Sequence, residues 1–172
     1  MLEFAHQEHV KSYYLDSRNQ TFELPPLTQQ EEADVCVIGA GFFGLSAALE
    51  LAEKGKKVIV LEGARVGFGA SGRSGGQAIN GFEEGIDEYI AQVGFDKAKK
   101  LWDMSLEAID IIDERIAKYG IQCDWKKGYA TLALNERRMD DLIEMEKASH
   151  ATFGYDKMQL WDKIGRASCR ER

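Results

Sequence analysis

The chain has 172 residues, of which 44% are hydrophobic and 30% charged, a composition typical of a soluble globular protein. Its formal net charge is −7 and no basic stripe occurs, so nucleic acid is not expected as a partner. No run of about eighteen apolar residues occurs, so no membrane span is predicted. The three cysteines have neither paired nor metal-ligating spacing, which excludes a disulfide framework and an obvious metal site and favours a reducing, cytoplasmic location.

Residues 1–33 are predicted to form an irregular N-terminal arm. This stretch is polar, has no apolar segment of the kind that marks a secretory signal, and contains both prolines of the chain, Pro25 and Pro26. Adjacent prolines block regular structure. The arm therefore leads into a folded domain without belonging to its core.

A strand–helix–strand unit is predicted after the arm. Residues 34–38 form a short apolar run ending at glycine, typical of a strand buried on both faces of a parallel sheet, with Cys36 as a small buried residue. Residues 43–54 have helical apolar spacing, and Gly55 supplies a left-handed end to that helix. Residues 57–61 form a second buried strand, which completes one crossover unit.

The glycine pattern between the first strand and the helix predicts a dinucleotide site. Gly39, Gly41 and Gly44 match G-x-G-x-x-G, and Glu62 follows Gly44 by eighteen residues at the end of the second strand. Gly39 permits the sharp turn, Gly41 leaves room for a pyrophosphate, and Gly44 allows close packing of helix on sheet. The helix N-terminus stabilises phosphate charge, and Glu62 is expected to accept hydrogen bonds from the ribose hydroxyls.

A glycine-rich loop follows at residues 63–81, with seven glycines. Its backbone can approach a ligand closely, and it replaces the helix and strand with which an NAD-binding fold normally continues, so it favours an extended FAD. A surface loop without a ligand is the alternative interpretation. The expected cofactor contacts in this loop are Arg65, Ser71, Arg73, Gly75, Gly76 and Gln77.

Residues 82–162 are interpreted as a helical segment and the first part of a substrate domain. Helices are predicted at 83–93, 96–119 and 136–150, and a strand at 128–134. The tryptophans of this region are expected to be packing residues, namely Trp102, Trp125 and Trp161. The acidic residues of the long helix are expected to be solvated, namely Asp110, Asp113 and Glu114.

The C-terminal residues 163–172 are expected not to belong to the natural protein. Their composition changes abruptly, and residues 164–172 resemble the translation of a sequencing-library adapter. We therefore expect the chain to be C-terminally truncated by this artefact. A natural basic tail is the alternative.

The motifs together resemble the D-amino-acid-oxidase superfamily of FAD-dependent oxidoreductases. The resemblance is carried by residues 34–62 and 67–77, and it is closest to the gamma-glutamylputrescine oxidase group through residues 12–14, Asp87 and residues 121–124. It implies an α/β fold in which a Rossmann-like FAD-binding βαβ unit is joined to the start of an α+β substrate domain.

The same resemblance implies an activity. A small-molecule primary amine would be oxidised at its C–N bond to an imine, which water converts to an aldehyde and ammonia, and oxygen would reoxidise the flavin. D-amino acids, glycine or sarcosine are alternative substrates of the superfamily, and an NAD-linked dehydrogenase or an inactive cofactor-binding fragment are further alternatives. No residue of this chain stands out as a catalytic base.

Overall fold

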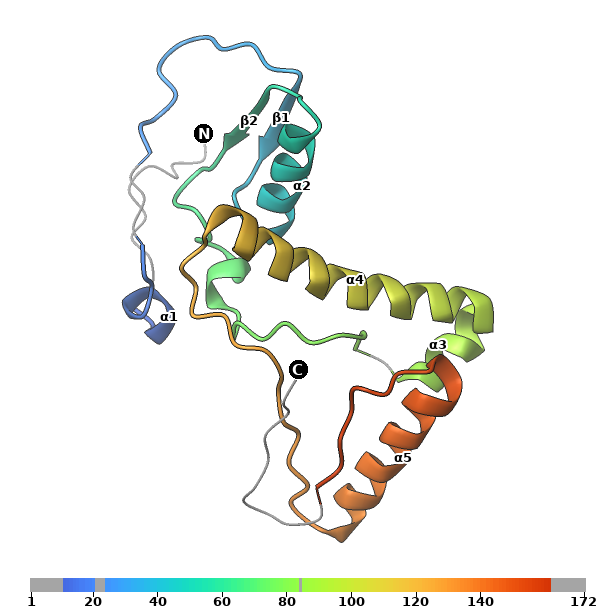
Figure 1. Ribbon diagram of the computed structural model, residues 1–172. Helices are drawn as coiled ribbons and strands as arrows, with labels where there is room; N and C mark the ends of the chain where they lie inside the picture. Colours follow the sequence, from blue (N-terminus) through green and yellow to red (C-terminus); the bar gives the residue numbers. More distant parts are fainter. Residues whose placement is uncertain (1–10, 21–23, 84, 162–172) are drawn as a thin grey trace. The chain divides into compact units, whose positions relative to one another are not determined.

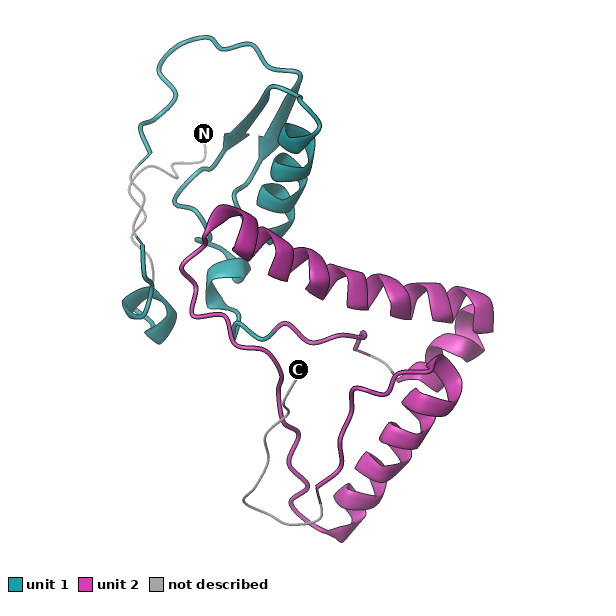
Figure 2. Cartoon of the chain, viewed as in Figure 1, with its two compact units in different colours: residues 1–77 teal, residues 78–172 magenta. Residues whose placement is uncertain are grey.

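The computed structural model describes residues 11–20, 24–83 and 85–161, and these form parts of two compact units. The first unit ends at Gln77 and the second begins at Ala78 (Figure 2). The predicted tail at 163–172 lies outside the described residues. None of the described helices is long and apolar enough to cross a membrane.

The first unit is built on a parallel strand–helix–strand element (Figure 1). Strand β1 (Val35–Ile38) pairs in parallel with β2 (Val58–Leu61), with Val35 opposite Val58 and Ile38 opposite Leu61. Helix α2 (Phe42–Glu53) connects the two strands and contacts both of them. The predicted elements are confirmed, with boundaries that differ by only one residue.

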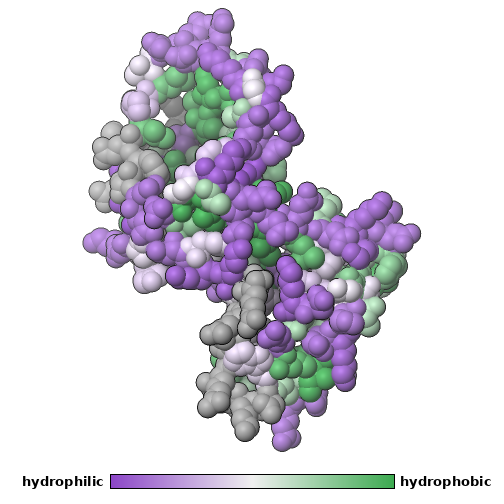
Figure 3. Space-filling view, in the orientation of Figure 1, coloured by the Kyte–Doolittle hydropathy of each residue, from purple (hydrophilic) through white to green (hydrophobic). Residues whose placement is uncertain are grey.

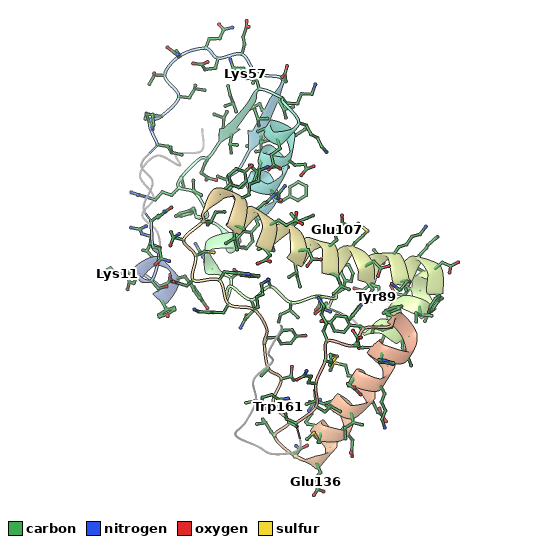
Figure 4. The ribbon with its side chains drawn as sticks, viewed as in Figure 1. Lys11, Lys57, Tyr89, Glu107, Glu136 and Trp161 are labelled. Atoms are coloured by element: carbon green, nitrogen blue, oxygen red, sulfur yellow. The ribbon has the colours of Figure 1, made fainter. Side chains whose placement is uncertain are left out.

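The two ends of this element are closed by different interactions. At one end, Asp34 accepts a hydrogen bond from the Lys57 backbone N–H at 2.8 Å through its carboxylate (Lys57 is labelled in Figure 4). Gly55 follows α2 with φ of 78°, the left-handed conformation predicted for it, and its N–H donates to Ala52 O at 2.9 Å. The opposite end of the strands leads into the glycine turn.

The prediction that β1 is buried on both faces is wrong. Its side chains alternate between half-buried and exposed, and Ile38 is 87% exposed. Cys36 is also exposed, so its interpretation as a buried residue is wrong as well. Side chains of a strand alternate between faces, and α2 covers only one of them. Figure 3 shows apolar surface over the two strands.

The described part of the second unit contains three helices, α3 (Ile86–Val93), α4 (Phe95–Tyr119) and α5 (Glu136–Phe153). Helices α3 and α4 are separated by Gly94, whose φ is 81°. Gly120 and Gly154, both left-handed, end α4 and α5. The three predicted helices are therefore confirmed, although α3 begins three residues later than the prediction at residue 83.

Aromatic residues pack the helices of this unit together. The ring of Trp102 lies 5.3 Å from that of Phe153 and 5.5 Å from that of Tyr155. These distances are typical of favourable aromatic pairs. The prediction that Trp102 is a packing residue is confirmed.

Two secondary-structure predictions are wrong. Residues 128–134 form no strand, and Leu134 within them is 86% exposed. A strand needs a hydrogen-bonded neighbour, and the β1–β2 pair is the only ladder in the described parts of the chain. The arm is not wholly irregular either, because Ser12 accepts a hydrogen bond from Leu15 N and caps a single helical turn, α1 (Tyr13–Asp16).

Asp113 is not simply solvated, contrary to the prediction. Its carboxylate accepts hydrogen bonds from the Trp125 indole at 2.9 Å and from the Lys127 ammonium at 2.7 Å. The bond from Lys127 holds the pKa of Asp113 below its ordinary value, burial opposes that effect, and the Trp125 bond lowers it further. The carboxylate thereby ties the segment that follows α4 back onto that helix.

Candidate dinucleotide-binding site

The turn between β1 and α2 has the conformation that the glycine pattern predicted. Gly39 has φ of 102°, a conformation that residues with a Cβ atom rarely adopt. Its N–H donates to Leu61 O at 2.7 Å, so the turn begins where the two strands end side by side. The chain then enters α2 within three residues.

Gly44 lies where helix and turn are in closest approach. A Cβ atom at this position would lie 2.0 Å from the carbonyl oxygen of Gly39 and 3.3 Å from Val37 Cγ1. No side chain fits at the first distance. The predicted role of Gly44 in close helix–strand packing is confirmed.

Gly41 is the N-cap of α2 and has no side chain with which to cap the helix. The hydroxyl of Ser71, 29 residues away, accepts the Phe42 N–H at 3.0 Å instead. A Cβ on Gly41 would lie 2.9 Å from that same oxygen. The absence of a Cβ at Gly41 thus makes room for the Ser71 hydroxyl, which borders the start of α2.

The Glu62 carboxylate points into the glycine turn. One of its oxygens accepts the Ala40 N–H at 2.7 Å, and the other accepts the Ala64 N–H at 3.0 Å. Each carboxylate oxygen can accept more than one hydrogen bond, so both retain capacity for a ligand hydroxyl. The sequence predicted that Glu62 would bind the ribose hydroxyls. It did not predict the hydrogen bond between Glu62 and the Ala40 N–H.

The glycine-rich loop returns to the turn and is bonded to it. The Gly67 N–H donates to Ala40 O at 3.0 Å, and the short 3₁₀-helix η1 (Ala70–Arg73) follows. This segment brings Ser71 to the start of α2. The structure therefore brings together five of the ten predicted cofactor residues, which are Gly39, Gly41, Gly44, Glu62 and Ser71.

The other five lie along the loop. Arg73 donates to Phe68 O at 3.5 Å and its guanidinium lies 5.9 Å from the centre of the Phe68 ring, so it folds back within the loop. The amide of Gln77 lies over Gly75, and Gly76 has φ of 73°. Arg65 is exposed. Contact of these residues with a cofactor stays a prediction.

Metal binding has no counterpart in this geometry. Within the described ranges, no group of three histidine, cysteine or acidic side chains is placed to hold a metal ion. The polar groups that converge at the turn are instead backbone N–H groups, one hydroxyl and one carboxylate. This donor set suits a phosphate and a sugar diol.

Comparison with known proteins identifies the family. Residues 34–172 match the family described as FAD dependent oxidoreductase, DAO. The chain belongs to this family. Its members depend on FAD, so the turn, the Glu62 carboxylate and the loop lie in an FAD-dependent oxidoreductase sequence.

Individual relatives are also oxidoreductases by name. The chain is 87% identical over 163 residues to "Probable oxidoreductase OrdL" of Haemophilus influenzae, which covers 95% of this chain and 38% of that protein. It is 42% identical over 155 residues to gamma-glutamylputrescine oxidoreductase of Escherichia coli, covering 90% of this chain and 36% of that protein. The chain therefore spans less than two fifths of the length of these relatives. No solved structure matches it.

The residues at the turn fit the ADP half of FAD. The first N–H groups of α2 have no acceptor within their own helix, and the helix dipole favours an anion at the same place. Gly41 adds no side chain of its own at this end, Ser71 places a hydroxyl there, and Glu62 lies beside it with hydrogen-bonding capacity for a diol. Both a pyrophosphate and a ribose therefore find suitable partners in this chain.

Proposed function

We propose that the first unit binds the ADP half of FAD and that the whole protein is an FAD-dependent amine oxidoreductase. The family match and the convergence of Glu62 and Ser71 on the glycine turn support this proposal. The observation that carries it is the Glu62 carboxylate bonded to Ala40 N, because it places an acid beside the start of α2.

Each polar group has a role in the proposed complex. The N–H groups at the start of α2 bind the pyrophosphate, the Ser71 hydroxyl binds one of its oxygens, and Glu62 binds the adenosine ribose. The negative charge of Glu62 disfavours a ribose 2′-phosphate. Arg73 at the end of η1 and Gln77 beyond it lie along the flavin side of the cofactor.

The proposed substrate is a primary amine similar to gamma-glutamylputrescine, which is oxidised at its C–N bond to an imine. Water then hydrolyses the imine to an aldehyde and ammonia. The name of the Escherichia coli relative supports this substrate class at 42% identity. FAD, when bound, accepts the two electrons of the oxidation. The residues described above bind and orient it, and oxygen is the proposed final acceptor.

FAD binding is tested with Glu62→Ala and with the matched control Glu32→Ala, which removes an exposed acid from the same unit. Charge-assisted hydrogen bonds contribute about 1.5–3 kcal/mol, so Glu62→Ala should weaken FAD binding by tenfold or more. The Glu32 variant should bind as the original chain does. Flavin fluorescence titration measures both dissociation constants.

The substrate is tested on the whole protein, loaded with flavin, under anaerobic conditions. Gamma-glutamylputrescine should bleach the flavin absorbance and yield one aldehyde per flavin reduced. D-alanine, glycine and sarcosine serve as rival substrates. Faster bleaching by one of these three would replace the proposed amine, and a protein that binds NAD but no flavin would contradict the proposal as a whole.

A further inference from the structure

The glycine-rich loop contains a second copy of the glycine spacing found in the turn. Residues 67–72 read G-F-G-A-S-G, which is again G-x-G-x-x-G, as in residues 39–44. In both copies the first glycine is left-handed, with φ of 102° at Gly39 and 69° at Gly67. In both, the middle glycine is the N-cap of a helix, Gly41 for α2 and Gly69 for η1.

The third glycine makes the same contact in both copies. A Cβ on Gly44 would lie 2.0 Å from Gly39 O, and a Cβ on Gly72 would lie 2.1 Å from Gly67 O. In each case the obstacle is backbone, which cannot move aside as a flexible side chain can. The first unit therefore contains two turns of the same construction. In each, the third glycine lies against the carbonyl oxygen of the first glycine.

The second turn is bonded to the first at two points. The Gly67 N–H donates to Ala40 O at 3.0 Å, and the Ser71 hydroxyl accepts the Phe42 N–H at 3.0 Å. Ser71 is the residue immediately before Gly72. The close approach that requires a glycine at position 72 is thus adjacent to the hydroxyl that reaches α2.

We infer that the second glycine turn positions the Ser71 hydroxyl at the start of α2, and that Gly72 is a positioning residue for binding of the cofactor phosphate. A serine hydroxyl that accepts the Phe42 N–H still has its own hydrogen to donate to a phosphate oxygen. The role toward phosphate rests on the proposed function, whereas the placement of Ser71 rests on the two turns alone.

The inference is tested first without cofactor, by Gly72→Ala and the matched control Gly69→Ala. A Cβ on Gly69 meets no atom within 4 Å, and its φ of −76° lies outside the left-handed range. The Phe42 N–H begins α2 and has no acceptor within the helix, so its protection depends on Ser71. Hydrogen exchange of that amide in the full chain should quicken by about fivefold or more in Gly72→Ala and in Ser71→Ala, and should stay unchanged in Gly69→Ala.

The second measurement is a double-mutant cycle on FAD affinity. Ser71→Ala and Gly72→Ala should each weaken FAD binding by about fivefold to tenfold, and the double variant should bind no more weakly than the weaker single variant. Gly69→Ala should leave the dissociation constant unchanged. Fully additive losses in the double variant would overturn the inference, because Gly72 would then act independently of Ser71.

Other outcomes separate this inference from the proposed function. An original chain that binds no FAD would defeat the proposed function, while the exchange of the Phe42 amide would still decide the placement of Ser71. Fast exchange throughout α2 in Gly72→Ala would overturn the inference, because a positioning residue should release Ser71 alone. Exchange in Gly72→Ala that matches Gly69→Ala would overturn it as well.

Discussion

At the scale of single residues, the glycine turns depend on positions that lack a Cβ atom as well as on the polar side chains of Glu62 and Ser71. Gly44 and Gly72 are needed because a backbone carbonyl occupies the space that a Cβ would take. Gly41 leaves room for Ser71, which supplies from another segment the cap that a glycine cannot. The sequence pattern correctly predicted the sharp turn at Gly39 and the close approach at Gly44, because both depend mainly on neighbouring residues, whereas the role of Gly41 toward a pyrophosphate stays a prediction.

Gly44→Ala should destabilise the first unit by about 2 kcal/mol or more, although alanine is a better helix former than glycine by about 1 kcal/mol. The reason is the 2.0 Å distance between the new Cβ and Gly39 O, which must be relieved by moving helix or turn. The free energy of unfolding in urea measures the loss.

The control for Gly44→Ala is Ala52→Ser, at an exposed position of the same helix. Its stability should stay within about 0.5 kcal/mol of the original chain. A stable Gly44→Ala protein would show that α2 can move away from β1 at little cost.

At the scale of elements, the parallel β1–α2–β2 unit follows from local spacing, but the contacts among its ends do not. In residues 34–61, the apolar spacing and the glycines that end the first strand and the helix are enough to predict both strands and the helix. The strand expected at 128–134 was wrong because strand formation depends on a partner, which apolar alternation within one segment cannot supply.

Asp113 provides a pH-dependent tie between α4 and the segment after it. Its pKa is held below its ordinary value, chiefly by the hydrogen bond from Lys127. A carboxylate with a lowered folded-state pKa contributes stability that is fully present above its unfolded pKa, near 4, and that is lost as the pH falls through the folded pKa. Acidification below about pH 4 should therefore loosen this segment.

Asp113→Asn tests this tie, with Asp110→Asn on the same helix as the control. In the Asp113 variant, the Trp125 indole and the Lys127 ammonium lose a charged acceptor. The fluorescence of Trp125 should therefore be shifted already at neutral pH, and part of its change on acidification should be lost. The control should behave as the original chain. Equal acid responses in both variants would show that other carboxylates govern this region.

At the scale of the whole molecule, the chain joins a unit that contains the glycine turn to a helical unit, and it covers 38% of the length of its Haemophilus influenzae relative. Family membership and FAD dependence follow from the match over residues 34–172. The substrate of the whole protein rests on the proposal above, since the site described in this chain is proposed to bind only the ADP half of the cofactor.

Ligand binding should stabilise the first unit by mass action. FAD at about 100 times its dissociation constant should add about 2.7 kcal/mol to the free energy of unfolding. ADP should compete with FAD because it carries the pyrophosphate and ribose, whereas riboflavin, which has neither, should compete poorly. Thermal unfolding with each ligand measures the difference, and preferential stabilisation by riboflavin would place the main contacts on the flavin side instead.

Local spacing along the chain is enough to predict the parallel strand–helix–strand unit, the glycine turn and the dinucleotide class of ligand, because each depends on a few neighbouring residues. The folded structure was needed to show that Glu62 bonds to Ala40, 22 residues away, and that Ser71 caps α2 across 29 residues. It also decided that one face of β1 is exposed and that Asp113 holds Trp125. The physical reason is that a side chain finds its partner through the path of the whole backbone, and spacing along the chain does not specify that path.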